Sequence, residues 1–223
     1  PVPHLQSQVP RQPLVDHDQR NLIALRQTNV IRMLAYSGIA QAGFMLAPFV
    51  ASQYGGIDAI VIYLVLYAAT NLGAFAVVMA IARRTRSAEI SSFGGLFAYS
   101  PGLAVALSVF LASFVGIPPL GIWYGKLSVM RALIESQGRW ATVLAIFVAL
   151  NTAIAAYYYL NVAKTMWFDD APEGETTPIK VPTPLRFAVG IALVATIALG
   201  VAPGPLTDAA TPDATPAAAP SGR

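Results

Sequence analysis

The chain has 223 residues, of which 56% are hydrophobic and 11% are charged, and its mean hydropathy is +0.59. Soluble domains carry about a quarter charged residues, so this composition indicates a membrane protein. The chain has no cysteine, and both histidines, His4 and His17, lie near the N-terminus. Disulfides and cysteine-based zinc or iron–sulfur sites are therefore excluded, and no metal site is expected. The scattered net charge of +3 gives no indication of nucleic-acid binding.

Residues 1–20 are rich in proline, glutamine and charge, and they show no helical periodicity. A secretory signal peptide needs an apolar core, which this stretch lacks. The sequence therefore predicts a disordered or loop segment. Because the chain starts with Pro1 rather than methionine, we also expect a processed, truncated or frameshifted product.

Six apolar runs follow, and most are near the roughly 20 residues that a helix needs to cross the hydrocarbon core. They lie at about 33–51, 57–82, 101–117, 119–134, 140–167 and 187–206. An apolar segment in lipid must satisfy its own backbone hydrogen bonds, which predicts helices. We therefore expect an all-α transmembrane bundle over residues 21–206, followed by a disordered Ala/Pro-rich tail at 207–223.

The number of crossings depends on the segment GIPPLG, residues 116–121, between the third and fourth runs. Two separate crossings there would divide the basic residues between the two sides of the membrane. One interrupted crossing instead places eight of them on one side and Arg139 on the other, in better agreement with the positive-inside rule. The eight are Arg26, Arg32, Arg83, Arg84, Arg86, Lys164, Lys180 and Arg186. We predict five crossings, the third one broken, with the first helix starting in the cytoplasm.

Lys126 is the only ionisable residue well inside an apolar run, and its helical neighbours are apolar. Loss of hydration disfavours an ammonium group, which suits a residue that takes up and releases a proton. The preceding Pro118 and Pro119 remove backbone donors and free carbonyl groups, as in the interrupted helices of transport proteins. The alternative is a surface turn from which Lys126 extends to the lipid headgroups. We favour the proton-transfer role.

Several uncharged polar residues recur at helical spacing. Tyr63, Tyr67 and Asn71, together with Thr70, form one stripe of the 57–82 run. Such a stripe lines a hydrated proton path or bonds neighbouring helices, and the sequence does not decide between the two. The shorter stripe of Ser37 and Gln41 has the same two interpretations.

Three other features are interpreted structurally. The consecutive tyrosines 157–159, with Trp167 and Phe168, predict an aromatic belt at the membrane interface. Arg131 and Glu135 are spaced as a surface ion pair. Asp58 has the position of a carboxylate at a helix N-terminus.

Five stretches in series resemble the C-terminal half of subunit N of bacterial NADH-quinone oxidoreductase, one of the antiporter-like membrane subunits of respiratory complex I. They are NVIRMLAYSGIAQAGFML (29–46), YLVLYAATNLGAFAVV (63–78), SFGGLFAYSP (92–101), LASFVGIPPLGIWYGK (111–126) and AAYYYLNVAKTMWF (155–168). Their order and spacing match over about residues 21–206. Lysine after YG favours subunit N over subunit M, which carries glutamate there.

The resemblance implies a multi-pass protein of the bacterial inner membrane that takes part in proton translocation coupled to quinone reduction. It maps Lys126 onto the lysine of the family's second discontinuous helix. It implies subunit M-like and K-like neighbours and the lipid bilayer as partners. NADH, flavin, iron–sulfur clusters and quinone are expected in other subunits of this oxidoreductase, so this chain is expected to hold no cofactor.

The chain also departs from the family. Ile31 replaces a lysine, Gln41 replaces a histidine and Asn161 replaces an arginine, so none of these positions can carry the relatives' charge. The helices of the N-terminal half-channel have no counterpart in this sequence. A non-pumping structural fragment is therefore one alternative function. An antiporter-like subunit of a cation/proton antiporter or a membrane hydrogenase is the other.

Overall fold

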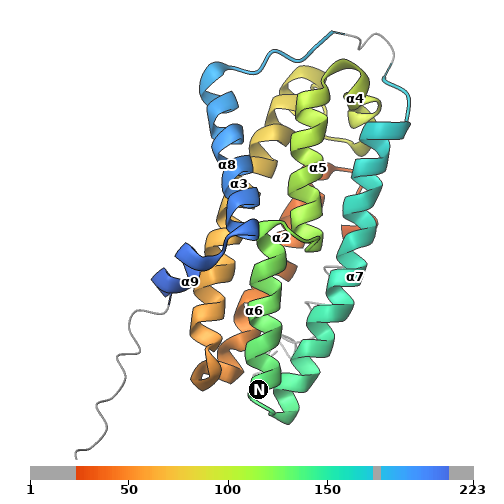
Figure 1. The fold of residues 1–223 in the computed structure, drawn as a ribbon. Coiled ribbons are helices and arrows are strands. Elements are labelled where there is room, and N and C mark those ends of the chain that lie inside the picture. The colour runs from red at the N-terminus through yellow and green to blue at the C-terminus, as the bar shows by residue number, and fades with distance from the viewer. Residues whose placement is uncertain (1–23, 173–176, 211–223) are drawn as a thin grey trace, which may run out of the picture.

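The computed structural model describes residues 24–172 and 177–210 (Figure 1). The described residues form helices, with one isolated antiparallel bridge between Asn29 and Glu89. In chain order the helices are α2 (Val30–Leu46), the 3₁₀ helix η1 (Ala47–Tyr54), α3 (Gly56–Thr85), the 3₁₀ helix η2 (Ile90–Phe93), α4 (Leu96–Tyr99), α5 (Pro101–Val115), α6 (Gly121–Glu135), α7 (Arg139–Phe168), α8 (Thr183–Val201) and α9 (Gly204–Ala210). The prediction of an all-α bundle is confirmed.

The predictions for the two ends of the chain fall mostly on residues outside the described ranges. The predicted disordered stretch 1–20 and the tail beyond residue 210 lie outside the described residues. The predicted tail began at residue 207, but residues 207–210 form the second half of α9. Helical structure thus extends four residues beyond the predicted boundary.

Local sequence explains where the long helices begin and end. Asn29 caps α2 by accepting a hydrogen bond from the Arg32 amide at 3.1 Å. The carboxylate of Asp58 lies in the first turn of α3, and Arg83 and Arg84 lie in its last turn. Both placements complement the helix dipole. The predicted position of Asp58 at a helix N-terminus is confirmed.

Within residues 24–172 and 177–210, four apolar helical stretches are long enough to cross a membrane: Val30–Tyr54, Gly56–Thr85, Arg139–Phe168 and Thr183–Val201. The fifth crossing is built from α5 and α6. Each has 15 residues, or about 22 Å of helix, which is shorter than the roughly 30 Å hydrocarbon core. Figure 1 shows α5 and α6 following one another along the bundle, and both contact the 30-residue α7. The prediction of five crossings with the third one broken is confirmed.

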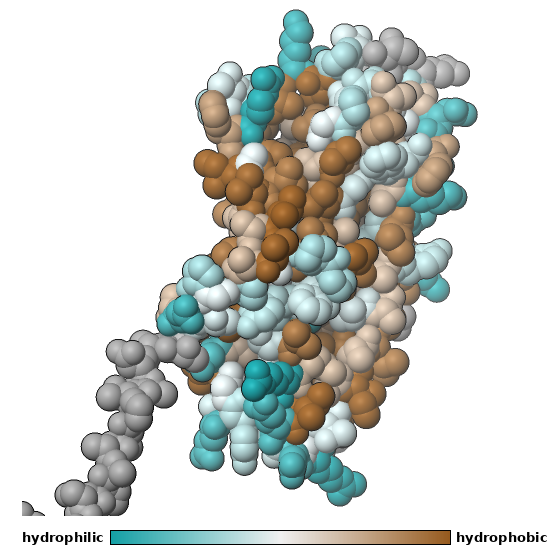
Figure 2. Space-filling model, in the orientation of Figure 1, coloured by the Kyte–Doolittle hydropathy of each residue, from teal (hydrophilic) through white to brown (hydrophobic). Residues whose placement is uncertain are grey.

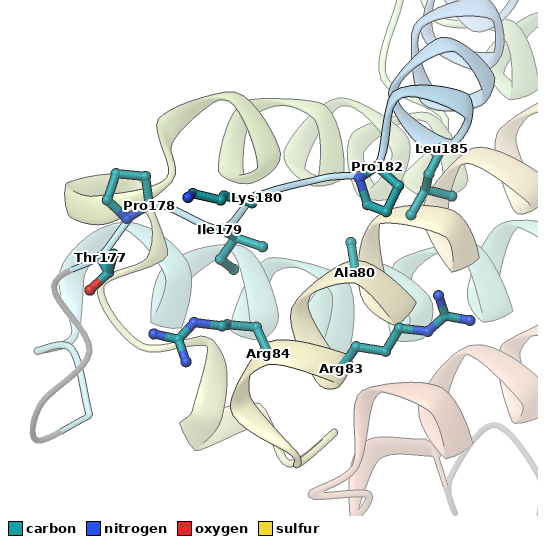
Figure 3. A pocket seen from close by; sticks show the side chains of 9 residues that line it. All are labelled: Ala80, Arg83, Arg84, Thr177, Pro178, Ile179, Lys180, Pro182 and Leu185. Carbon is teal, nitrogen blue, oxygen red and sulfur yellow. The ribbon is translucent and has the colours of Figure 1, made fainter.

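The eight basic residues that were predicted to share one side lie toward one end of the bundle, which we call the basic end. Backbone hydrogen bonds join the start of α2 to the segment after α3, from Val30 N to Ala88 O at 2.8 Å and from Ile90 N to Thr28 O at 2.6 Å. The last turn of α3 and the segment leading into α8 line a cavity at this end (Figure 3). Arg139 begins α7 at the opposite end (Figure 1). The predicted eight-to-one distribution is therefore reproduced by the fold.

The buried core surrounds α3, which contacts α2, α5, α6 and α8. Large aromatic side chains such as Phe110, Phe114 and Tyr159 are fully buried. Many other apolar side chains point outward instead. Figure 2 shows a broad brown surface over the upper half of the molecule, with teal side chains concentrated toward the top and bottom. This arrangement is that of a bundle surrounded by lipid.

Candidate functional site

The interruption between α5 and α6 forms the centre of the candidate site. Gly116 ends α5 with a φ of +93°, and its amide bonds the carbonyls of Ala112 and Ser113. A Cβ at Gly116 would lie 3.1 Å from Cδ of Lys126. The left-handed backbone therefore favours glycine at this position, and an added Cβ would also press against the lysine side chain.

Lys126 lies in α6, one turn beyond the interruption, and only 8% of its surface is exposed. Its Nζ donates hydrogen bonds to the carbonyls of Phe114 and Val115, both at 2.9 Å. These carbonyls belong to the last turn of α5, where backbone acceptors lack helical partners and carry the negative end of the dipole. Nζ also lies 5.5 Å from the ring centroid of Phe44. Such a site holds a cation through dipoles and an aromatic face.

Lys126 stands apart from the other buried polar groups. Among the described residues with buried polar side chains, it is the one that carries a charge, and no described carboxylate forms an ion pair with it. Two of its three possible donor directions are used by the α5 carbonyls. The alternative in which Lys126 extends to the headgroups is wrong, because the side chain bonds inside the bundle.

A tyrosine cluster lies next to this lysine. Its members are Ser37, Gln41, Tyr63, Tyr67 and Tyr159. Tyr63 is fully buried and donates a short hydrogen bond to Oε1 of Gln41. The Tyr159 hydroxyl is buried beside the side chains of Ser37 and Gln41 and makes no hydrogen bond of normal geometry. Helices α2, α3 and α7 each contribute at least one hydroxyl or amide to this cluster.

Phe114 connects the lysine to the tyrosine cluster. Its carbonyl accepts from Lys126. Its ring stacks on Tyr159 with centroids 5.4 Å apart and meets Tyr67 at 6.0 Å. The last turn of α5 therefore contacts both the buried cation and the cluster of protonatable hydroxyls.

A separate hydroxyl cluster, consisting of Thr70, Ser113 and Thr196, joins α3, α5 and α8 near the same interruption. Thr70 Oγ1 lies 3.4 Å from Ser113 Oγ and 3.3 Å from Thr196 Oγ1. Ser113 Oγ also accepts a hydrogen bond from the amide of Ile122 at 3.3 Å. This amide belongs to the first turn of α6, which has no helical acceptor for it. The hydroxyl cluster therefore satisfies backbone groups that the interruption leaves unpaired.

The predicted α3 stripe is divided between these two clusters. Tyr63 and Tyr67 belong to the tyrosine cluster, whereas Thr70 belongs to the hydroxyl cluster. Asn71 is half-buried and belongs to neither. The interpretation of the stripe as interhelical hydrogen bonding is confirmed for Tyr63 and Thr70. A channel-lining role for Tyr63, Tyr67 and Asn71 stays a prediction.

The aromatic-belt interpretation of residues 157–159 is wrong for two of the three tyrosines. Tyr157 is 67% exposed, but Tyr158 and Tyr159 are 4% and 0% exposed. Three consecutive residues of a helix point in different directions, and here two of them face the core. Trp167, near the end of α7, has an exposed ring that bonds Ser108 and stacks on Phe97.

Sequence reasoning therefore missed Tyr159, Ser113 and Thr196. Ser113 and Thr196 are hydroxyls within apolar stretches of α5 and α8, which is the one signal that the sequence offered for them. Of the three positions that depart from the family pattern, Gln41 alone lies in the site, since Ile31 and Asn161 are exposed. The predicted surface pair of Arg131 and Glu135 is confirmed, with Nε 2.7 Å from Oε1. The described residues contain no group of acidic or histidine side chains that could hold a metal ion.

Comparison with known families agrees with this geometry. Residues 20–152 match the transmembrane family described as NADH:quinone oxidoreductase/Mrp antiporter, TM. The chain belongs to this family. The matched segment includes α2 to α6, and therefore the interruption and Lys126.

Two relatives carry more specific names. NADH-quinone oxidoreductase subunit N of Heliobacterium modesticaldum is 39% identical over 191 residues, which cover 86% of this chain and 39% of the relative. Subunit N 2 of Sorangium cellulosum is 42% identical over 190 residues, which cover 84% of this chain and 37% of the relative. The chain thus spans about two fifths of the length of the curated relatives it matches.

Solved structures extend the likeness to the fold. A chain of respiratory complex I from Thermus thermophilus with bound Aureothin is 32% identical, with a TM-score of 0.72 over 88% of this chain and 44% of that chain. A chain of an archaeal membrane-bound sulfane sulfur reductase is 24% identical, with a TM-score of 0.73 over 88% of this chain and 39% of that chain. The second likeness concerns the fold alone.

Proposed function

We propose that this chain is the C-terminal part of a subunit N of bacterial NADH-quinone oxidoreductase, and that it moves protons across the inner membrane when quinone is reduced elsewhere in the complex. Lys126 is the residue that takes up and releases the proton. The observation that supports this role is its burial at the broken helix, where two α5 carbonyls hold its ammonium group without a carboxylate.

The surroundings of Lys126 suit a group that changes charge. Burial disfavours the ammonium form, whereas the carbonyl end of α5 and the Phe44 ring favour it. With these effects opposed, a modest change of potential from neighbouring subunits suffices to shift the proton. Tyr63, Tyr67 and Tyr159 supply hydroxyls beside the lysine, and Asn71 is the further candidate on α3.

The cofactors and partners of this activity belong to the rest of the complex. NADH, flavin, iron–sulfur clusters and quinone are bound by other subunits, and subunit M-like and K-like proteins are the membrane neighbours. The relatives named subunit N are 39% and 42% identical to this chain, whereas a chain of the Mrp complex from Dietzia is 18% identical. These identities favour the quinone oxidoreductase over a cation/proton antiporter.

The test uses a bacterial subunit N whose matching part is replaced by residues 21–206 of this chain. In inverted membrane vesicles, Lys126→Ala is expected to lower the protons moved per NADH by the share that this subunit contributes, because its proton carrier is lost. Ser128→Ala is the matched control, because it removes a hydroxyl from the same helix that bonds only Tyr124 O. Native gels report assembly. An unchanged ratio in the assembled Lys126→Ala complex would show that another residue carries the proton.

A further inference from the structure

The groups that surround the ammonium group of Lys126 come from two different parts of the bundle. The carbonyls of Phe114 and Val115 lie 2.9 Å from Nζ and belong to α5, which forms one broken crossing with the helix of the lysine. The ring of Phe44 comes from α2, a separate crossing, and its centroid lies 5.5 Å from Nζ. The carbonyls therefore stay with the lysine, whereas the ring follows the position of α2.

Phe44 lies in a dry part of the bundle, which strengthens its attraction for a cation. Only 4% of Phe44 and 8% of Lys126 are exposed. A cation within about 6 Å of a ring centroid is attracted by the negative potential of the ring face, and the attraction grows when water is excluded. Within the described ranges, no carboxylate pairs with Lys126 in place of this attraction.

The same face of α2 also reaches the tyrosine cluster. Gln41 precedes Phe44 by three residues, so both side chains point to the same side of the helix. Gln41 accepts the hydrogen bond of the Tyr63 hydroxyl. The Tyr63 ring lies against Gly125, the neighbour of Lys126, where an added Cβ would be 3.1 Å from Cδ2 of the tyrosine. One helix thus carries both the ring that attracts the ammonium group and the amide that orients a tyrosine hydroxyl.

The backbone changes its geometry directly after Phe44. Helix α2 ends at Leu46, the 3₁₀ helix η1 begins at Ala47, and Ala51 within η1 has a non-helical backbone. A 3₁₀ stretch inside a helical crossing often marks a hinge. A bend at this junction would change the distance between the Phe44 ring and Nζ without moving the α5 carbonyls.

We propose that Phe44 is a positioning residue for proton transfer. Its ring face keeps Lys126 in the ammonium form on the α5 carbonyls, and it makes this attraction depend on the position of α2. The inference rests on the proposed role of Lys126 as the proton carrier. The ring exchanges no proton itself and acts through the lysine alone.

The first experiment is a double-mutant cycle on the full chain, purified in detergent. Phe44 is replaced by trifluorophenylalanine, which keeps nearly the same ring size and removes most of the negative potential of the ring face. In mildly acidic buffer, the ratio of folded to unfolded protein is expected to fall about fivefold in the chain with Lys126, because the cation–π attraction is lost. The fall is expected to stay below about twofold in the Lys126→Met chain, where no cation faces the ring. Equal falls in the two chains would show that the ring only packs, and would overturn the inference.

The second experiment uses the complex carrying residues 21–206, with one, two or three fluorines on the Phe44 ring. The protons moved per NADH are expected to decline stepwise toward the value for Lys126→Ala, because each fluorine weakens the attraction for the ammonium group. The same series at Phe93 is the matched control, since this ring is fully buried and none of the described cations lies over it. The control series is expected to leave the ratio unchanged, and native gels report assembly of every variant.

The failure of this inference and the failure of the proposed function give different results. If the Phe44 series matches the Phe93 series while Lys126→Ala still lowers the ratio, the inference is overturned and the proposed function stands. If Lys126→Ala leaves the ratio unchanged, the proposed function is overturned, and the positioning role of Phe44 is overturned with it, even where the double-mutant cycle shows coupling.

Discussion

The tyrosine cluster with Lys126 and the hydroxyl cluster lie beside the same interruption, but their chemistry differs. Lys126 and three tyrosines are groups that can exchange a proton, and the lysine bonds the carbonyl end of α5. The hydroxyl cluster holds serine and threonine only, and Ser113 bonds the amide end of α6. Lys126 thus bonds the free carbonyl end of α5, and the hydroxyl cluster bonds the free amide end of α6.

The difference separates two tasks that a broken membrane helix imposes. Free backbone groups in lipid must find partners, and hydroxyls fulfil this need without any charge. The ammonium group of Lys126 provides a partner for the free carbonyls at the end of α5, and it can also change its protonation state. We infer that the hydroxyl cluster holds the interruption in shape, while the lysine side performs the transport. Three predictions test this division, in order of expected effect.

The largest effect on stability is expected where α8 packs against the interruption between α5 and α6. A Cβ at Gly200 of α8 would collide with the carbonyl of Pro119 and with the backbone at Leu120 and Gly121. Gly200→Ala is therefore expected to lower the free energy of unfolding by about 2–3 kcal/mol, as overpacking of a rigid site does. Gly190→Ala is the control on the same helix, because nothing lies within 4 Å of its added Cβ. Unfolding in detergent measures both, and equal stability of the two variants would contradict the close packing.

Two buried tyrosines are expected to respond differently to loss of their hydroxyl. Tyr63→Phe leaves Gln41 Oε1 without its donor and is expected to cost about 1–3 kcal/mol of stability. Tyr159→Phe removes a buried hydroxyl that lies beside Ser37 and Gln41 without a hydrogen bond of normal geometry, so it is expected to cost less stability than Tyr63→Phe. Both are expected to slow proton transport in the complex. Unimpaired transport in Tyr159→Phe would remove that residue from the proposed path.

The broken crossing could be predicted because its signals are local. Pro118 and Pro119 cannot continue a helix, and the loop charges agree better with the positive-inside rule for one interrupted crossing than for two separate ones. The burial of Lys126 followed from its apolar neighbours. Its partners could not be predicted, because they are backbone carbonyls that the interruption exposes.

The two clusters depend on contacts between helices that are distant in the sequence. The sequence of three consecutive tyrosines does not indicate which of the rings faces α2. Tyr159 was therefore predicted to lie at the membrane interface. The hydroxyl of Thr196 in an apolar helix does not tell which residue it meets, because its partner is Thr70, which lies 126 residues earlier. The cavity at the basic end likewise joins α3 to a distant segment.

The smallest effect is expected from Thr196→Val, which removes one weak hydroxyl contact at 3.3 Å and costs about 0.5–1.5 kcal/mol. Its comparison with Lys126→Ala tests the central claim most directly. Both variants are placed in the complex carrying residues 21–206, and the protons moved per NADH are measured in the same vesicles. The account predicts that Lys126→Ala lowers this ratio by the share of this subunit, while Thr196→Val leaves it unchanged. Equal loss in both, or no loss in Lys126→Ala, would contradict the assignment of proton transfer to the lysine side.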